Sequence, residues 1–295
     1  VGGGSVLDAT KFIAAAVRWP NRDPWQIFAD YGASITSAIP LGAVLTLPAT
    51  GSEMNSGAVI SRRASNDKVF FGNEAVFPQF SILDPATTHS LPPRQTANGI
   101  VDAFIHVTEQ YLTYPADAPL QDRQAEAVLL TLIAEGPKAL ARPDDYTVRA
   151  NLMWAATNAL NGLIGCGVPG DWATHMIGHE LTALYGIDHA QSLAIVLPGL
   201  LRHQLPRKQA KLEQYACRVW NLRAGKRPAD LAERAIVRTE EFFHSLGVGT
   251  RLADYGIGTD APRRVAENQA RRNAPLGEHG DIRAQQIEEI LNSRC

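Results

Sequence analysis

The sequence predicts an α/β region followed by an all-helical region, and two observations lead to this fold class. Up to about residue 90, short apolar runs typical of strands lie between turns rich in small residues. After Leu91-Pro92-Pro93, apolar residues recur instead at helical spacing. The consecutive prolines mark the expected boundary, and 295 residues suffice for two medium domains. We therefore expect an α/β domain over 1–92 and an all-helical domain over 93–295.

The α/β region is predicted to begin with a helix over 5–16. Apolar residues recur there at helical spacing, and Ser5 is the expected N-cap. The following stretch, 17–40, is rich in Trp, Pro and Asp and is expected to be a loop with a short helical piece. A buried strand over 40–48 then leads into a turn of small residues at 49–53. Shorter strands are expected at 69–71 and 79–84.

The helical region is predicted from apolar residues that recur every three or four positions. The expected helices span 94–114, 120–141, 147–165, 171–185, 190–204, 208–222 and 229–246.

Composition argues against several classes of protein. A formal net charge of −2 does not suit a nucleic-acid surface, since phosphate binding needs a basic excess. No run approaches the roughly 18 apolar residues of a membrane span. The three cysteines, Cys166, Cys217 and Cys295, are too few and too scattered for a disulfide framework or a thiolate metal site. We expect reduced thiols, a cytoplasmic location, and neither a nucleic-acid nor a membrane partner.

The chain opens with the Gly-rich stretch Val1-Gly2-Gly3-Gly4-Ser5 and no initiator Met. A Gly-rich turn normally follows a strand, so we expect residues upstream of Val1, and a short flexible leader is the alternative. A turn that enters a helix suits an anion, because free N–H groups and the helix dipole both point at it.

Five polar residues have the spacing of metal ligands. Asp102 and His106 lie four residues apart on one predicted helix, which places both side chains on one face. His175 and His179 repeat this spacing, and His189 follows beyond the end of their helix. A set of nitrogen and carboxylate ligands suits Zn²⁺ or Fe²⁺ better than Mg²⁺ or Ca²⁺.

Each pair has a plainer explanation when it stands alone. An Asp-x₃-His pair is usually a salt bridge, and a lone His-x₃-His is more often structural than metal-binding. Both pairs together, in apolar surroundings where ionisable groups are costly to bury, favour a metal site. A zinc-protease motif is excluded, because Ala183 stands where H-E-x-x-H requires its second His.

Four stretches, in this order along the chain, resemble the iron-dependent (type III) alcohol dehydrogenase family. Within it, the branch of NADPH-dependent, broad-range aldehyde reductases is the most similar. The last stretch, with its paired histidines and Asp188-His189-Ala190-Gln191-Ser192, is the most specific. The matching stretches are 2–8, 46–55, 99–106 and 175–198.

The resemblance implies the metal ligands Asp102, His106, His175 and His189. The choice of His175 over His179 comes from the family pattern, since spacing alone leaves both open. His179 would lie beside the metal, where it could relay a proton or line the substrate pocket.

The resemblance also implies a partial dinucleotide-binding domain over 1–92 and a helical, metal-binding catalytic domain over 93–295. The cofactor would lie between them. Gly3, Gly4 and Ser5 would hold its pyrophosphate. The other implied contacts are Thr46 and Thr50 at a phosphate or the nicotinamide ribose, Lys68 at the ribose, and Asp8 and Asn55 towards the nicotinamide.

We expect an oxidoreductase that transfers hydride between NADP and an aldehyde or primary alcohol, with one divalent metal, Zn or Fe. NAD in place of NADP remains an alternative, and relatives are usually dimers or larger assemblies. A dehydroquinate-synthase-like lyase would need a Lys and Arg cluster that the apolar metal region lacks. A metal-binding helical fragment without catalysis is the other alternative.

Overall fold

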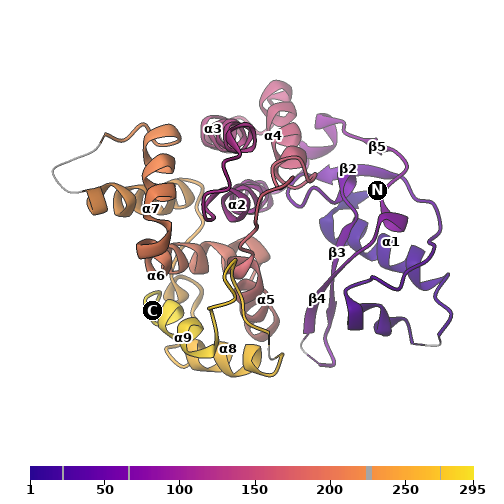
Figure 1. Ribbon diagram of the computed structural model, residues 1–295. Helices are drawn as coiled ribbons and strands as arrows, with labels where there is room; N and C mark the ends of the chain where they lie inside the picture. The colour runs from indigo at the N-terminus through magenta and orange to yellow at the C-terminus, as the bar shows by residue number, and fades with distance from the viewer. Residues whose placement is uncertain (22, 66, 224–227, 273) are drawn as a thin grey trace.

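The computed structural model describes residues 1–21, 23–65, 67–223, 228–272 and 274–295. Its α/β part and its helical part lie side by side (Figure 1). This confirms the expected fold class, although the division into two domains at residue 92 stays a prediction.

A small parallel sheet forms the centre of the α/β part. Its strand order is β1-β2-β5, and helix α1 connects the first two strands. Gly3 of β1 pairs with Leu47, and Ala43 of β2 pairs with Ser81. The two later strands were expected here but are shorter than predicted. The elements are β1 (Gly2–Gly3), α1 (Gly4–Ala16), β2 (Ala43–Leu47) and β5 (Ser81–Ile82).

An antiparallel hairpin of β3 (Gly57–Arg62) and β4 (Asp67–Gly72) projects from this sheet region towards α5 (Ala173–Tyr185; Figure 1). Only its second strand was predicted, at 69–71. Short 3-10 helices fill the connections, and the first of them is the helical piece expected within 17–40. They are η1 (Pro24–Asp30), η2 (Ser52–Met54), η3 (Glu74–Val76) and η4 (Pro85–Thr88).

The expectation that Ser5 caps the first helix is wrong. Helix α1 begins at Gly4 with Gly3 at the N-cap, and no side chain caps it. The chain passes from β1 into α1 without an intervening turn in which a Ser5 hydroxyl could bond back. The first N–H groups of α1 are therefore left without a side-chain cap.

The helical part contains eight α-helices among the described residues and one short 3-10 helix, η5 (Leu252–Tyr255). The helices are α2 (Pro93–Tyr111), α3 (Pro119–Ala141), α4 (Tyr146–Ala159), α5 (Ala173–Tyr185), α6 (His189–Arg218), α7 (Pro228–Ser245), α8 (Ala261–Ala270) and α9 (Ala284–Asn292).

Two helix predictions are corrected. The helices expected at 190–204 and 208–222 are one helix, α6, which continues through Pro198 and Pro206. Each proline removes one backbone hydrogen bond, but buried apolar residues on both sides of Pro206 hold the helix against its neighbours. The helix expected over 147–165 ends at Ala159, because a Gly-rich segment follows it. Helices α8 and α9 were not predicted.

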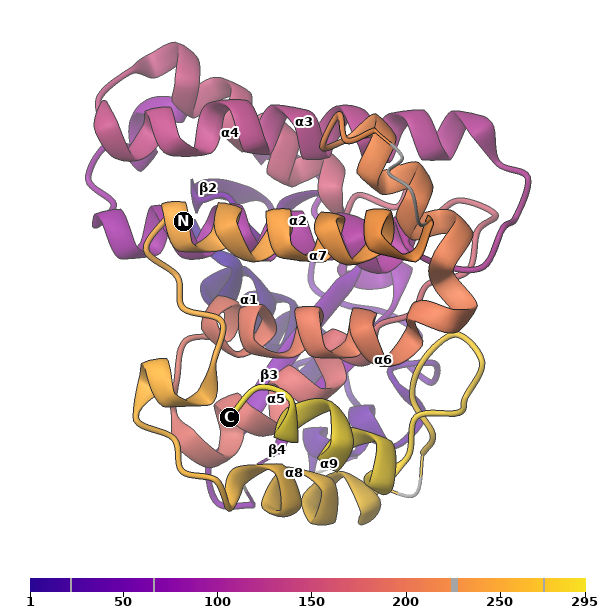
Figure 2. The ribbon, with the colours of Figure 1, turned by 90° about the vertical axis from the view of Figure 1, so that its left-hand side faces the viewer.

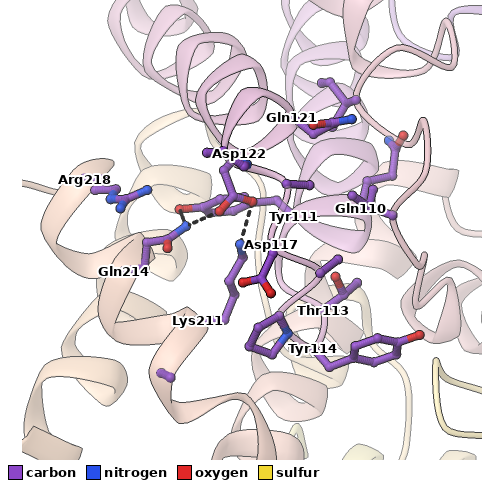
Figure 3. Close-up of a pocket in the computed structure, with 17 residues that line it drawn as sticks. Gln110, Tyr111, Thr113, Tyr114, Asp117, Gln121, Asp122, Lys211, Gln214 and Arg218 are labelled. Atoms are coloured by element: carbon purple, nitrogen blue, oxygen red, sulfur yellow. Dashed lines mark hydrogen bonds and ion pairs between the residues drawn. The ribbon is translucent and has the colours of Figure 1, made fainter.

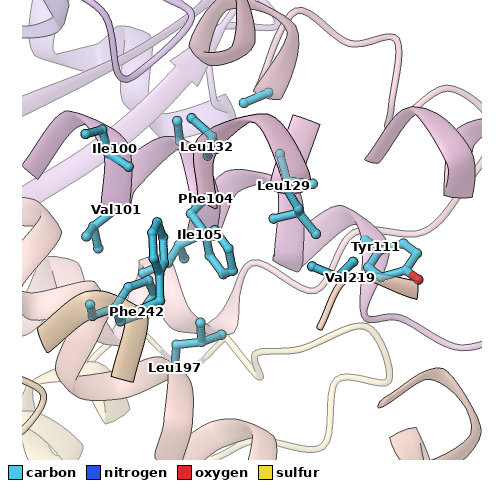
Figure 4. Close-up of a cluster of buried hydrophobic side chains, with 14 of the residues drawn as sticks. Ile100, Val101, Phe104, Ile105, Tyr111, Leu129, Leu132, Leu197, Val219 and Phe242 are labelled. Atoms are coloured by element: carbon cyan, nitrogen blue, oxygen red, sulfur yellow. The ribbon is translucent and has the colours of Figure 1, made fainter. Parts of the chain in front are cut away.

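Helix α2 lies inside the helical part, with α3, α6 and α7 around it (Figure 2). Val101, Phe104, Ile105 and Val107 are completely buried there, and Figure 4 shows several of these side chains packed against α3 and α6. Each buried side chain of this size contributes about 1.5–3 kcal/mol. A second core joins α5 and α6 to α8 and α9. The polar residues of α2 are therefore held in rigid surroundings.

The start of α2 touches the end of β2. A Cβ atom on Gly99 would lie 2.6 Å from the backbone oxygen of Pro48, so only glycine permits this approach. The contact brings the residues of α2 close to the turn that follows β2. No helix within the described ranges is long and apolar enough to cross a membrane.

Candidate metal centre

Helix α2 supplies Asp102 and His106. Both side chains are buried, and the Nε2 atom of His106 lies 3.8 Å from Oδ1 of Asp102. The spacing of four residues on a regular helix produces this approach, as expected from the sequence.

Two further histidines come from α5 and α6. His175 lies in the first turn of α5, and His189 is the first residue of α6. Gly186 ends α5 in a left-handed conformation, at a φ of 69°, and Asp188 and Gln191 form a capping box at the start of α6. The short connection thus turns the chain back and places His189 beside His175, with ring centroids 5.3 Å apart.

Three histidine nitrogens converge on one carboxylate oxygen. The Nε2 atoms of His175 and His189 lie 3.7 and 3.8 Å from Oδ1 of Asp102, like that of His106. Ligand atoms of Asp102, His175 and His189 all lie within 4.8 Å of one another. Ligands about 2.1 Å from a tetrahedral ion lie about 3.4 Å apart, so the distances from Asp102 to the three histidines are a few tenths of an ångström wider. His106 approaches Asp102 but is not in the group whose ligand atoms all lie within 4.8 Å of one another.

Two of these atoms have no partner although they are buried. Oδ1 of Asp102 and Nε2 of His175 form no hydrogen bond with any described residue. Such atoms are costly unless something else satisfies them. A divalent ion would satisfy both, and one oxygen with three nitrogens suits Zn²⁺ or Fe²⁺. The residues fit the expected metal.

Burial and charge act differently on the histidines. Burial lowers the pKa of His106 to about 4, although Asp102 opposes the shift. Burial also lowers the pKa of His189 and of His179, and the positive charge of Lys68 adds to it. For His175, burial is outweighed by the carboxylates of Glu109 and Asp102, which raise its pKa to about 9. A metal binds the neutral imidazole, so an ion bound by His175 would have to displace the proton from Nε2 of that ring.

His179 lies one turn after His175 on α5 and is buried. Its ring centroid is 5.1 Å from that of His189 and 6.2 Å from that of His175. The structure thus places His179 beside the other histidines, and its predicted proton-relay role stays a prediction.

Glu109 and Trp172 were missed by the sequence reasoning. Glu109 contacts Nδ1 of His175 with one carboxylate oxygen, and the Trp172 ring lies against His106 and His175. Glu109 lies three residues after His106 and therefore on the same helix face as His106 and Asp102. This spacing could have identified it. No sequence signal indicates Trp172, because its position depends on a left-handed conformation at the start of α5.

The glycine turn meets the turn after β2. A Cβ atom on Gly4 would lie 2.6 Å from Cγ2 of Thr50, and one on Gly3 would lie 2.8 Å from Cβ of Leu47. Ser5 is exposed, and Thr46 lies on β2. The structure therefore brings Gly3, Gly4 and Thr50 together, as a phosphate site requires, and their cofactor contacts stay predictions.

Asp8 and Asn55 both hold neighbouring segments of the protein. The two oxygens of Asp8 accept hydrogen bonds from Oγ of Ser52 (2.7 Å) and N of Val59 (2.8 Å). Asn55 accepts from the buried Lys11 Nζ with its side chain (3.0 Å) and its backbone (2.8 Å). The approach of both residues to the nicotinamide stays a prediction.

Lys68 lies on β4, and its positive charge acts on Asp8 and on Asp102. Burial lowers the pKa of Lys68 to about 8, and the two carboxylates oppose that shift. Lys68 thus lies near enough to both carboxylates for its charge to act on them, and its contact with the cofactor ribose stays a prediction.

A cavity of about 450 Å³ lies away from the metal site, between the end of α2, the start of α3 and the second half of α6 (Figure 3). Its polar residues pair with one another. Lys211 bonds Asp122 at 2.5 Å, and Gln214 donates to Asp122 and to the Tyr111 hydroxyl. None of the predicted metal ligands lines this cavity.

Comparisons with known proteins identify the family of this chain. The family description "Fe-containing alcohol dehydrogenase family, C-terminal" matches residues 96–295, and "Iron-containing alcohol dehydrogenase" matches residues 1–85. The chain belongs to the iron-containing alcohol dehydrogenase family, as its sequence motifs predicted.

Two curated relatives illustrate the range of the family. The chain is 59% identical over 284 residues to the NADPH-dependent aldehyde reductase YqhD of Escherichia coli, with 96% of this chain and 73% of YqhD covered. It is 39% identical over 293 residues to NADH-dependent butanol dehydrogenase B of Clostridium acetobutylicum, with 99% and 74% covered.

Solved structures show the same fold. A crystal structure of E. coli YqhD matches with a TM-score of 0.98 and 55% identity, covering all of this chain and 76% of that one. An NADH-dependent butanol dehydrogenase A from Thermotoga maritima matches with a TM-score of 0.93 and 32% identity, covering 100% and 75%.

Proposed function

We propose that the protein is a metal- and NADP-dependent alcohol dehydrogenase that acts as an aldehyde reductase. The observation that carries the proposal is the convergence of three histidine Nε2 atoms on Oδ1 of Asp102. The preference for NADP is supported by the greater similarity to an NADPH-dependent aldehyde reductase than to the NADH-dependent butanol dehydrogenases.

Asp102, His106, His175 and His189 would hold the ion. When bound, the metal supplies a Lewis acid for the substrate oxygen, and the nicotinamide exchanges the hydride. His189 is the most exposed of the four, with 26% of its side chain accessible against 5–7% for the others. The side of the site next to His189 is therefore where an aldehyde or a primary alcohol would approach.

Side chains beside the metal site would supply proton transfer, exclusion of water and a contact to the cofactor. His179 is neutral near pH 7, because burial keeps its pKa low, so it can accept a proton that an alcohol releases or pass one to the product. Trp172 covers the His106 and His175 rings and helps to exclude water from them. Lys68 offers a cation to the cofactor ribose.

The first experiment is a fluorescence titration of the metal-loaded chain with NADPH and with NADH, together with metal analysis. We expect tighter binding of NADPH and one equivalent of zinc or iron. Tighter binding of NADH would overturn the cofactor preference. Metal without binding of either nucleotide would favour the non-catalytic metal-binding fragment.

Replacement of His175 by Ala tests the ligand set. Because the variant lacks one of four ligands, we expect loss of bound metal and of aldehyde reduction, with circular dichroism unchanged. Unchanged metal content and activity would refute the assignment.

We also propose a homodimer or larger homo-oligomer in the cytoplasm. The three cysteines form no disulfide, which suits a reducing compartment. Light scattering after size-exclusion chromatography measures the assembly, and a monomer over the working concentration range would contradict it.

A further inference from the structure

We infer that Glu109 is a positioning residue of the metal site, which holds His175 by its Nδ1 atom and so directs Nε2 of the same ring at the metal. This inference rests on the proposed ligand set, in which His175 binds the ion. It concerns a residue that binds neither metal nor substrate.

Glu109 is placed for this role by α2. It follows His106 by three residues and Asp102 by seven, so all three side chains share one face of the helix. Its side chain is 2% exposed. A carboxylate buried this deeply requires partners, and both of its oxygens have one.

The two oxygens of Glu109 bind adjacent residues of α5. Oε2 contacts Nδ1 of His175, and Oε1 accepts a hydrogen bond of 2.7 Å from the backbone N–H of Thr174. The bond from Thr174 fixes the carboxylate plane, because an oxygen held by a backbone group cannot rotate freely. The other oxygen is thereby directed at the His175 ring.

The contact at Nδ1 determines whether Nε2, on the opposite side of the His175 ring, has a lone pair free to bind a metal. When Nδ1 carries the proton and donates it to a carboxylate, Nε2 of a neutral imidazole is left with a free lone pair. In this structure that Nε2 is buried, lies 3.7 Å from Oδ1 of Asp102, and has no hydrogen-bond partner among the described residues. A carboxylate behind a ligand histidine has this orienting effect in metal sites generally.

His106 and His189 lack such a partner. Their Nδ1 atoms are buried and form no hydrogen bond with any residue that the structure describes. The backbone of Ala49 opposes the lowering of the His106 pKa, but no carboxylate among the described residues contacts Nδ1 of that ring. Of the three proposed histidine ligands, His175 is thus the one whose orientation is fixed by a carboxylate.

Hydrogen bonds also hold the backbone of Glu109 and the start of α5 in place. The backbone N–H of Asp171 donates to the backbone oxygen of Glu109 at 2.9 Å. One oxygen of Asp171 accepts from the N–H of Ala173 (3.0 Å), and the other accepts from the buried Lys208 of α6 (2.6 Å). The start of α5 is therefore tied to both α2 and α6, so His175 cannot follow a displaced Glu109.

Glu109→Gln should remove the positioning of His175 with little change in side-chain volume. Glutamine has one acceptor oxygen, and it cannot accept from both Thr174 N–H and His175 Nδ1–H in the same arrangement. We expect metal affinity to fall about 10- to 100-fold, the usual effect of losing such a partner. The matched control is Thr108→Val, a buried neighbour whose hydroxyl, among the residues that the structure describes, bonds only the Ile105 carbonyl of its own helix (3.0 Å).

Competition between the full chain and a chelator for Co²⁺ measures affinity, and the visible absorption of bound Co²⁺ reports the ligand geometry. The inference predicts weaker binding and an altered spectrum for Glu109→Gln, with Thr108→Val like the unmodified protein. Equal affinities and spectra for all three would overturn it.

His175→Ala separates this inference from the proposed function. If His175→Ala keeps full Co²⁺ affinity, the ligand set fails and the inference fails with it. If His175→Ala loses Co²⁺ while Glu109→Gln does not, only the inference about Glu109 fails.

A measurement on the unmodified protein covers the case in which Glu109→Gln does not fold. Proton NMR of the Zn²⁺-loaded chain with ¹⁵N-labelled histidine should show one Nδ1–H resonance shifted far downfield by a carboxylate. Its absence would overturn the inference.

Discussion

The carboxylate of Glu53 accepts a hydrogen bond of 2.6 Å from the Thr157 hydroxyl, and this bond joins the turn after β2 to helix α4. Both residues are buried, and the second oxygen of Glu53 has no hydrogen-bond partner in the described part of the chain. Burial raises the pKa of Glu53, while the Thr157 hydroxyl and Lys11 oppose the shift. The α/β part and the helical part are thus connected by a polar contact without access to water.

Thr157→Val should destabilise the protein by about 1–3 kcal/mol, because it leaves a buried carboxyl with no hydroxyl donor. Urea unfolding measures the change. Thr131→Val is the control, since within the described part of the chain the Thr131 hydroxyl bonds only the Ala127 carbonyl one turn earlier, an exposed bond of 2.9 Å, and a change within about 0.5 kcal/mol is expected. Equal effects of the two substitutions would show that the Glu53 contact adds nothing.

Lys11 should make stability depend on pH in the alkaline range. Burial lowers its pKa to about 8 from an ordinary 10.5, although Asp8 and Glu53 oppose the shift. Between these two pKa values the unfolded chain binds more protons at this site than the folded chain, so the free energy of unfolding rises with pH. The comparison is with Lys11→Met, followed by urea unfolding from neutral pH upwards.

The difference between the unmodified protein and Lys11→Met should grow in favour of the unmodified protein through this range. The comparison removes contributions from other titrating groups, which both proteins share. Parallel pH curves would show that Lys11 has an ordinary pKa in the folded state.

Gly4→Ala should weaken NADPH binding about tenfold or more and leave the metal content unchanged. The new Cβ would collide with Thr50, and overpacking of this kind costs about 1–3 kcal/mol. The measurement is the fluorescence titration described above. Adding Thr50→Ser removes the methyl group at 2.6 Å and should recover part of the affinity. Recovery is expected to be partial because the Thr50 oxygen, 2.7 Å from the new Cβ, remains in Ser. Unchanged NADPH affinity of Gly4→Ala would contradict the prediction.

His106→Ala and His179→Ala should have different effects although both residues are buried histidines near Asp102. Loss of His106 removes a proposed ligand, so bound metal should be lost. Loss of His179 should leave the metal in place and lower turnover by about 10²-fold or more, which is the typical contribution of a proton-transferring group. Metal analysis beside steady-state kinetics distinguishes them, and loss of metal from His179→Ala would contradict the assignment.

The sequence predicted parts of the site that depend on local spacing. Asp102 and His106 share a helix, and their distance follows from the helix repeat. The approach of His189 depends instead on the turn at Gly186, and the family resemblance, not the spacing, selected His175 over His179. Glu109 escaped notice because a single acidic residue on a helix normally lies at the surface.

The fold was predictable to a similar degree. The long helices have clear apolar periodicity, and their positions were predicted within a few residues, except that α4 ends at Ala159. The break expected near Pro206 was wrong, since tertiary packing holds α6 together where local preference would end it. Strand β3 was missed because its pairing with β4 is a non-local property.

The unequal exposure of the four proposed ligands has a consequence for how long the protein keeps its metal in the cell. Because His189 is the most accessible of the four, a bound ion would be expected to enter and leave on that side, where substrate would also approach. A bound nucleotide or substrate would then obstruct the escape of the ion. We expect the enzyme to keep its metal longest while it is working and to lose it to cellular scavengers mainly during idle periods, when NADPH is scarce.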